Sequence, residues 1–493
     1  MQEALPPTLN DASLLRLDAL IEGEWVAATK RFTVHNPADG VQLAQVASHG
    51  SDSARLAVEA AQRALPGWAA RSALERARLL TRWAQLLRSH ADDLARLMTA
   101  EQGKPLSEAR GEVMYGASFL EWYAEEGRRV AGETIPSPDP SKRAWVWKQP
   151  VGVCAAITPW NFPLAMITRK VAPALAAGCT VMVKPAEQTP LTALAVAELA
   201  QRAGLPAGVL AVLTADAEDS IAIGRLWCEH AAVRHLSFTG STEVGRILMA
   251  QCAPTLKRLS LELGGHAPFI VFDDADLDAA VQGAIASKYR NAGQTCVCAN
   301  RFYVQAEVHD AFVAKLAEAV AQLRVGPGDA DGVQVGPLID AQALAKVRAH
   351  VEDAVAQGAK LAVGGQARAD LGPQFFEPTL LTGVSARMKV ATEETFGPVA
   401  PVLVFETEAQ AVQLANQSDY GLASYFYTRD IGRALRVAEA LEYGMVGINT
   451  GLIASAEFPF GGVKQSGFGR EGGHQGIDEY LDCKFVSLGG LQA

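Results

Sequence analysis

Residues 291–298, which read NAGQTCVC, form the segment with the clearest capacity for chemistry. They contain Cys296, and a thiolate is a strong nucleophile that a loop of small residues leaves accessible to a substrate. Residues 261–265, LELGG, precede them and supply a carboxylate at Glu262. Together the two segments predict a nucleophile and a general base, although a glutamate before two glycines can also simply cap a turn.

Most of the remaining cysteines are expected to be structural, because a free cysteine is usually a small buried hydrophobic residue. We expect this role for Cys154, Cys179, Cys228, Cys252 and Cys483. Cys298 has two interpretations. It either fills space beside the nucleophile or forms a disulfide with Cys296 under oxidation, which would block catalysis reversibly.

The composition is that of a large acidic protein. The 493 residues carry 44 Lys and Arg against 54 Asp and Glu, a net charge of −10, with no long basic cluster that would bind a phosphate backbone. The N-terminal residues lack the basic start and apolar run of a signal peptide, and no stretch of about 18 apolar residues predicts a membrane helix. Seven scattered cysteines favour a reducing compartment, so we expect a cytoplasmic protein.

The elements that must position the candidate residues form two successive α/β patterns. Short apolar runs alternate with amphipathic segments, which is typical of a buried parallel sheet covered by helices. The first pattern has expected strands at 152–158, 180–184, 209–214 and 235–238 and helices at 53–68, 73–99, 166–176, 191–203 and from 242 onward. The second has expected strands at 267–272 and 301–304 and helices at 277–290, 309–323 and 344–357. Because Cys296 falls in the second pattern, we predict an active site between two domains.

Further motifs occur along the chain in a fixed order. They read ITPWNFP at 157–163, KPAE at 184–187, SFTGSTEVG at 237–245, EETFGP at 393–398 and PFGGVK at 459–464. With the segments around Glu262 and Cys296, these motifs resemble the aldehyde dehydrogenase superfamily over nearly the whole chain, apart from the extreme N-terminal segment. The likeness is greatest to the succinate-semialdehyde dehydrogenases and their glutarate-semialdehyde relatives.

The resemblance implies an α/β fold with three parts. A Rossmann-type cofactor-binding domain would comprise residues 1–130 and 150–261, and a second α/β catalytic domain would comprise residues 262–465. Residues 131–149 and 466–493 would form a small β oligomerisation arm, for which the extended segments 144–149 and 480–488 are candidates. Such an arm implies a homodimer or homotetramer.

The expected pyrophosphate site differs from the usual dinucleotide fingerprint of three closely spaced glycines. Gly240 and Gly245 flank a predicted helix N-terminus after Ser241, where an anion can bind. A strand that ends in Gly-Ser-Thr is by itself more often only a helix cap. The resemblance implies cofactor binding at these residues and at Thr158 and Trp160.

The choice of cofactor depends on the segment after the strand at 180–184. Lys184 and Glu187 are expected beside the adenosine ribose, where an acidic side chain repels a 2′-phosphate. Glu187 therefore predicts NAD, with NADP possible because some family members with this glutamate use both. Glu394 and Phe396 match the residues that hold the nicotinamide ribose and ring, although alone Glu394 would be interpreted as a solvated charge.

The reaction that the resemblance implies begins with attack of the Cys296 thiolate on an aldehyde carbon. The resulting thiohemiacetal oxyanion would be stabilised by the side-chain amide of Asn161 and the backbone N–H of Cys296. Hydride then leaves for the nicotinamide. A water activated by Glu262, whose pKa burial can raise towards neutrality, would hydrolyse the thioester.

Two arginines carry the expected choice of substrate. Arg169 and Arg290 match positions that bind the distal carboxylate in the semialdehyde dehydrogenases, and a planar guanidinium suits a carboxylate. The alternative for either arginine is an ion pair with a neighbouring acid. Ser455 is a third candidate, although residues 451–457, GLIASAE, place this serine one residue later than close relatives often do.

The expected function is NAD-dependent oxidation of a short semialdehyde that carries a carboxylate, with succinate semialdehyde first and glutarate semialdehyde second. Another small aldehyde, such as an aminoaldehyde, remains open. A catalytically silent structural homologue is the alternative from a different class, and the presence of Cys296, Glu262 and Asn161 together argues against it. We expect no metal ion and no nucleic-acid or membrane partner.

Overall fold

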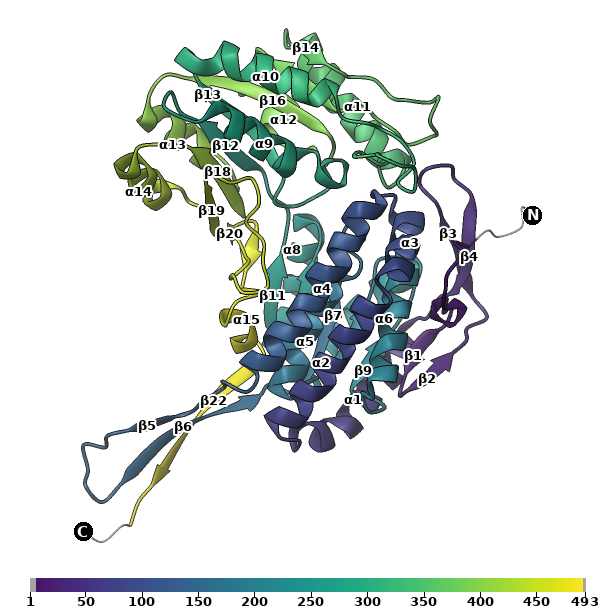
Figure 1. The fold of residues 1–493 in the computed structure, drawn as a ribbon. Coiled ribbons are helices and arrows are strands. Elements are labelled where there is room, and N and C mark those ends of the chain that lie inside the picture. Colours follow the sequence, from purple (N-terminus) through teal and green to yellow (C-terminus); the bar gives the residue numbers. More distant parts are fainter. Residues whose placement is uncertain (1–5, 491–493) are drawn as a thin grey trace.

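Two mainly parallel β-sheets organise residues 6–490, the part of the chain that the computed structural model describes (Figure 1). Five central strands of the first sheet run parallel, and antiparallel strands add to both of its ends. In sheet order they are β2 (Glu24–Val26), β1 (Ala19–Ile21), β9 (Leu210–Val212), β8 (Thr180–Lys184), β7 (Val153–Ile157), β10 (Val233–Thr239), β11 (Arg258–Glu262) and β21 (Gly467–Phe468). The expected α/β architecture with a Rossmann-type sheet is confirmed.

Helices cover both faces of this sheet, and alternate strand residues show why. In β7, Cys154 and Ala156 join the core under α2 to α6, whereas Val153 and Ala155 join the core under α1, α7 and α8. Both sets are apolar because a parallel strand is buried on both faces. The helices are α1 (Ser51–Ala69), α2 (Ala73–Ser89), α3 (Ala91–Gln102), α4 (Leu106–Glu126), α5 (Ala165–Ala177), α6 (Pro190–Ala203), α7 (Ala217–Glu229) and α8 (Thr242–Cys252).

Two features of these helices differ from the sequence expectation. The single helix expected at 73–99 is two helices, α2 and α3, which join at His90. Helix α4 was not expected, since its glycines weaken the helical pattern. One of them, Gly116, is required by packing, because a Cβ there would lie 2.0 Å from the Leu164 side chain that precedes α5.

The second sheet contains the strands that follow the first unit in sequence. Its order is β14 (Lys360–Val363), β15 (Thr379–Thr382), β16 (Val399–Phe405), β13 (Ala299–Gln305), β12 (Ala267–Val271), β18 (Ala423–Tyr427) and β19 (Met445–Ile448). All neighbours are parallel except β14 with β15. Its helices are α9 (Leu277–Lys288), α10 (His309–Ala321), α11 (Ala341–Ala356), α12 (Lys389–Thr392), α13 (Glu408–Asn416) and α14 (Ile431–Ala440).

A three-stranded antiparallel sheet projects from the body of the molecule (Figure 1). It consists of β5 (Glu133–Ile135), β6 (Arg143–Pro150) and β22 (Leu481–Leu488). The range 466–493 that we expected for the arm also contains β21, which pairs with β11 in the first sheet. None of the helices within residues 6–490 is long and apolar enough to cross a membrane.

Candidate active site

The two sheets meet end to end, and this meeting brings the candidate residues together. Glu262 ends β11 beside Thr239, the last residue of β10. The chain then crosses to the second sheet, where Ala267 of β12 pairs with Ala299 of β13. The loops before β12 and β13 therefore face the carboxyl ends of the first sheet's strands, and the second of these loops carries Cys296.

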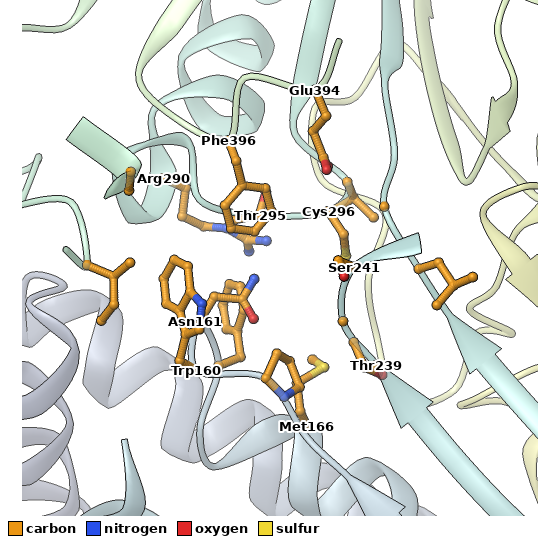
Figure 2. Close-up of a pocket in the computed structure, with 18 of the residues that line it drawn as sticks. Trp160, Asn161, Met166, Thr239, Ser241, Arg290, Thr295, Cys296, Glu394 and Phe396 are labelled. Carbon is orange, nitrogen blue, oxygen red and sulfur yellow. The ribbon is translucent and has the colours of Figure 1, made fainter. Parts of the chain in front are cut away.

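A cavity of about 470 Å³ lies at this junction and receives residues from both units (Figure 2). Figure 2 shows Asn161, Arg290, Cys296 and Glu394 around the same space. Its lining includes Tyr115, Pro159, Trp160, Asn161, Phe162, Met166, Arg169, Thr239, Gly240, Ser241, Leu263, Gly264, Arg290, Thr295, Cys296, Ile339, Gln342, Lys346, Ala454, Glu394, Phe396 and Phe460. The sequence-based prediction of a site between two units agrees with this arrangement.

The loop that carries the nucleophile has an unusual backbone. Asn291, Ala292 and Gly293 have φ angles of 51°, 54° and 74°, so three successive residues are left-handed. Non-glycine residues avoid this region, and such strain is found at functional sites when the surroundings enforce it. Here Gln294 enforces it, because its side chain donates to the Asn291 carbonyl and accepts the N–H of Ile339 at 2.9 Å.

Cys296 is partly exposed, and it lines the cavity. Desolvation raises the pKa of this thiol to about 12, and the carboxylates of Glu394 and Glu262 act in the same direction. Arg169 lowers the pKa but does not compensate for burial. The raised pKa favours the protonated thiol, so the thiol must transfer its proton to a base before it can attack an aldehyde.

Asn161 lies across the cavity from the nucleophile loop and is tied to it. Its side-chain Nδ2 donates to the carbonyl of Gln294 at 3.0 Å, two residues before Cys296. The amide is 5% exposed and therefore held in place rather than solvated. Uncharged amide donors fixed beside a nucleophile can stabilise an oxyanion without titrating.

Glu262 is buried beside the cavity but does not line it. Burial raises its pKa well above the ordinary value, and the nearby Glu471 raises it further. Its Oε2 atom has no hydrogen-bond partner within residues 6–490. A carboxylate with a raised pKa is a stronger base than an ordinary one, so Glu262 has, once ionised, the properties of a general base.

Arg290 is, like Lys346, a cation of the cavity without an ion pair among the described residues. Its guanidinium makes no ion pair or hydrogen bond in the part of the chain that the structure describes, and it lies 5.4 Å from the ring centroid of Phe162. Figure 2 shows it reaching into the space shared with Cys296. A half-buried guanidinium that has no ion pair and lies at the same cavity as a nucleophile can bind an anionic substrate.

Arg169 is partly engaged, as the alternative interpretation of an ion pair predicted. Its Nε donates to Glu471, which also accepts from Lys170. Its Nη2 has no partner among the described residues, and the side chain is buried with 1% exposure at the cavity wall. Two cations thus share one carboxylate, so one positive charge remains beside the cavity.

Ser455 does not line the cavity, in contrast to the sequence expectation. Its hydroxyl donates to Glu457, and the preceding residue, Ala454, lines the cavity instead. Residues 451–457 therefore present a methyl group, and not a hydroxyl, at this part of the cavity wall. A different hydroxyl is present at the cavity, because Tyr115 lines it and its buried oxygen lacks a partner within residues 6–490.

The carboxyl ends of β7 and β10 form the expected cofactor site. Strand order reverses between these neighbours, with β8 and β9 on one side and β11 on the other, and dinucleotides bind at such a switch point. Thr158 and Thr239, at the two strand ends, each have a buried hydroxyl oxygen without a partner in the described chain. Ser241 caps α8 by accepting the N–H of Val244 at 3.3 Å. Open polar groups and a helix N-terminus fit a dinucleotide.

The two units also meet at the expected nicotinamide end. The rings of Trp160 and Phe396 contact edge to face, with centroids 5.7 Å apart. Glu394 accepts the N–H of Gly265 at 3.1 Å, and burial raises its pKa to about 7. It is thus not a solvated loop charge. Gly245 keeps α8 close to this region, since a Cβ there would lie 2.5 Å from Leu263.

Lys184 and Glu187 lie at the carboxyl end of β8, outside the cavity lining. The Lys184 ammonium donates to Ser220 at 2.8 Å and is 3.7 Å from the Glu187 carboxylate. Burial lowers the pKa of Lys184, and Glu187 opposes that shift. Glu187 itself is partly exposed, so its charge is available to a ribose bound beyond the strand ends.

Cys298 is fully buried and points away from the cavity. Its thiol donates to the carbonyls of Ser287 and Lys288, each at 3.1 Å. A disulfide with Cys296 would require this side chain to leave both carbonyls. These contacts support the interpretation that Cys298 fills space. A redox role for Cys298 stays a prediction that no contact in the structure supports.

Among the polar residues of the cavity that the sequence reasoning missed, three lie within helices, namely Tyr115, Gln342 and Lys346. Gln342 and Lys346 lie one turn apart on α11, and Tyr115 lies on α4. No local signal marks them, because each is an ordinary polar position on an amphipathic helix. Only the packing of α4 and α11 around the junction brings them to the site.

Comparison with known proteins agrees with this fold. The chain matches the aldehyde dehydrogenase family over residues 25–486 and belongs to that family. It is therefore an NAD(P)-dependent aldehyde dehydrogenase, in which the bound nicotinamide takes up the hydride that the substrate carbon releases.

Individual relatives cover almost the whole chain. A succinate-semialdehyde dehydrogenase of Escherichia coli K12, named for NADP(+), is 58% identical over 98% of this chain and 99% of its own. A glutarate-semialdehyde dehydrogenase of Pseudomonas aeruginosa is also 58% identical, over 98% and 100%. The crystal structure of a succinate-semialdehyde dehydrogenase from Burkholderia pseudomallei is 60% identical, with a TM-score of 0.96 over 98% and 100%.

Proposed function

We propose that this enzyme oxidises a short aldehyde that carries a distal carboxylate, with succinate semialdehyde as the first substrate and glutarate semialdehyde as the second. The observation that carries the proposal is the unpaired guanidinium of Arg290 in the cavity of Cys296. A half-buried guanidinium without an ion pair keeps its hydrogen-bond donors available for the carboxylate of a substrate. The names of the semialdehyde-specific relatives support the same substrate class.

The other wall of the cavity complements Arg290. The Nη2 atom of Arg169 has no hydrogen-bond partner among the described residues. Arg169 and Lys170 both form an ion pair with the same carboxylate, that of Glu471. Tyr115 adds an unpartnered hydroxyl whose pKa burial raises, so it remains a neutral donor. A carboxylate has two oxygens that accept several hydrogen bonds, which matches these three donor groups.

The catalytic roles follow from the same geometry. Cys296 is the nucleophile, and the amide of Asn161 with the Cys296 N–H stabilises the thiohemiacetal oxyanion. After the carbon has lost its hydride, Glu262 turns towards the cavity and takes a proton from the water that hydrolyses the thioester. Its raised pKa supports this role, because a strongly acidic carboxyl would be a poor base.

The cofactor preference is NAD, with NADP as a second cofactor. Glu187 is close enough to Lys184 to reduce the attraction of that ammonium for a 2′-phosphate. The carboxylate also repels the phosphate directly. The relative from Escherichia coli is named for NADP(+), so the strength of this preference needs measurement.

The remaining proposals concern organisation. We propose residues 1–130 with 150–261 as the cofactor domain and 262–465 as the catalytic domain. Within the ranges 131–149 and 466–493, we propose β5, β6 and β22 as the arm. The projecting sheet exposes Trp147 on its central strand β6 and Phe485 on its edge strand β22, 50% and 66% exposed, and this supports assembly into a homodimer or homotetramer. A cytoplasmic location stays a prediction.

The function is tested by the rate of reduced-cofactor formation with succinate semialdehyde, glutarate semialdehyde and butanal, each with NAD and NADP. We expect a kcat/KM at least ~10-fold higher for the acidic aldehydes, since a charge-assisted bond contributes about 1.5–3 kcal/mol. Equal or faster turnover of butanal would contradict the substrate proposal while leaving the family assignment intact.

A further inference from the structure

One face at the start of α4 holds the backbone of both loops of the active site. Glu108 and Glu112 are four residues apart in α4, so they share this face. Lys104 lies just before the helix, which begins at Leu106. Lys104 and Glu112 are 2% and 3% exposed, and they form an ion pair inside the protein. None of the three residues lines the cavity.

The ion pair forms hydrogen bonds with the backbone of the segment that carries Asn161. The Lys104 ammonium donates to the backbone carbonyl of Asn161 at 2.7 Å and lies 4.0 Å from the ring centroid of Phe162. The other partner, Glu112, accepts the N–H groups of Leu164 and Ala165 at 3.0 and 3.2 Å. Residues 161–165 are thus fixed at both ends by one buried pair.

The same face reaches the nucleophile loop. Glu108 accepts the N–H of Asn291 at 2.9 Å, which is the first of the three left-handed residues before Cys296. The Asn291 side chain in turn donates to the Asn161 carbonyl at 3.1 Å. The Asn161 carbonyl therefore accepts two hydrogen bonds, one from Lys104 before α4 and one from Asn291 in the nucleophile loop.

The turn before α4 is also a contact between the two units. Leu106 donates its N–H to Gly328 at 2.8 Å. A Cβ at Gly328 would lie 2.4 Å from the Lys104 carbonyl, and one at Gly336 would lie 2.2 Å from the Gly103 carbonyl. Lys104 is therefore placed by both units, so it can relate the Asn161 loop of the first to the Cys296 loop of the second.

A buried ion pair is a poor means of gaining stability, because desolvation of the two charges offsets most of their attraction. Apolar residues of similar size would fill the same space at least as well. The hydrogen bonds that this pair makes are specific to the Asn161 segment, which points to a geometric role. Small displacements of groups that bind a transition state can reduce turnover ~10²-fold.

We propose that Lys104 and Glu112 are positioning residues that set the amide of Asn161 against the reacting carbonyl oxygen. They act through the Asn161 backbone and do not touch the substrate. The inference rests on the proposed role of Asn161 as an oxyanion donor. It predicts that the effect of removing the pair depends on the presence of the Asn161 amide.

A double-mutant cycle tests this dependence. The variant Lys104→Met/Glu112→Leu replaces the pair by apolar side chains and leaves no lone buried charge. We expect it to lower kcat ~10–100-fold with little change in KM, and Asn161→Ala to lower kcat ~10²–10³-fold. Combining all three substitutions is expected to give the kcat of Asn161→Ala alone. Multiplied losses, or an unchanged kcat in the Lys104→Met/Glu112→Leu variant, would overturn the proposal.

Controls separate positioning from general damage. Glu101→Gln is the matched control, because Glu101 is equally buried and accepts the N–H groups of Leu191 and Thr192 in α6, in the way that Glu112 does for α5. We expect it to keep its kcat. Lys104→Arg keeps a donor near the Asn161 carbonyl and is expected to retain more activity than Lys104→Met at a similar Tm.

Two further readouts make each outcome informative. Hydrolysis of an activated ester by Cys296 without cofactor uses the same oxyanion donors and does not depend on the identity of the aldehyde, so it is measured for every variant. If Asn161→Ala leaves ester hydrolysis and kcat unchanged, the proposed role of Asn161 fails first. If the Lys104→Met/Glu112→Leu variant does not fold, Glu112→Gln and Lys104→Arg provide the cycle with Asn161→Ala, and additive losses there would overturn the proposal.

Discussion

Gly265 lies directly against Cys296, and a Cβ at this glycine would be 2.3 Å from the Cys296 carbonyl oxygen. The parallel pairing of β12 with β13 brings the two loops together, since Ala267 lies opposite Ala299. The N–H of Gly265 is also fixed, because it donates to Glu394. The second glycine after Glu262 is thus required by the position of the nucleophile.

Gly265→Ala is therefore expected to displace the Cys296 backbone and lower kcat by ~10²-fold or more. The matched control is Gly67→Ala, because no atom lies within 4 Å of the position of the added methyl group. Steady-state kcat and the rate of Cys296 alkylation by iodoacetamide check the prediction. Retention of wild-type kcat in Gly265→Ala would show that the loop can shift without loss of function.

The pH dependence of turnover follows from the raised pKa of Glu262. Below that pKa the carboxyl is protonated and cannot accept a proton from water, so kcat should rise with pH by up to about tenfold per unit until the group ionises. In Glu262→Gln, kcat should be lower and this dependence should disappear. A kcat profile at saturating substrate checks both; an unchanged slope in the variant would assign the ionisation to another group.

Tyr115→Phe removes the unpartnered hydroxyl from the cavity. We expect KM for succinate semialdehyde to rise ~2–10-fold, which corresponds to loss of one neutral hydrogen bond of about 0.5–1.5 kcal/mol. The KM for butanal should not change, and Tm should be maintained because the free enzyme loses no bond. Equal effects on both aldehydes would place the hydroxyl in general packing instead of carboxylate binding.

Glu187→Ser is expected to raise kcat/KM for NADP by at least ~10-fold, since the repulsion of the 2′-phosphate is removed while Lys184 remains. Glu59→Ser, an exposed acid on α1, serves as the control for the change in net charge. Initial rates with both cofactors give the ratio. No change in the ratio would mean that the ribose lies away from Glu187.

Much of the fold could be predicted because its strands are buried on both faces. The strand expected at 180–184 is β8, and the helix expected from 242 is α8, because Ser241 caps it. Helix α4 could not be predicted in the same way. Its buried face carries Glu112 and small residues as well as apolar ones, and these positions make sense only against α5.

The site shows the same division between local and long-range information. Cys296 and Asn161 stand in motifs, so the sequence predicts them and the structure places both at one cavity. The partial neutralisation of Arg169 could not be predicted, since Glu471 is far away in sequence. Nor could the presence of Tyr115 at the cavity, which depends on how α4 packs at the junction, or the absence of Ser455 from its lining.

The most direct test of the account compares kcat/KM of the wild type and Arg290→Ala for succinate semialdehyde and for butanal, with NAD. Arg290 makes no ion pair within residues 6–490, so its removal should leave folding intact. We predict a loss of ~10–100-fold for succinate semialdehyde and little change for butanal, because only the first carries a carboxylate. An equal loss with both aldehydes, or none with either, would contradict the account.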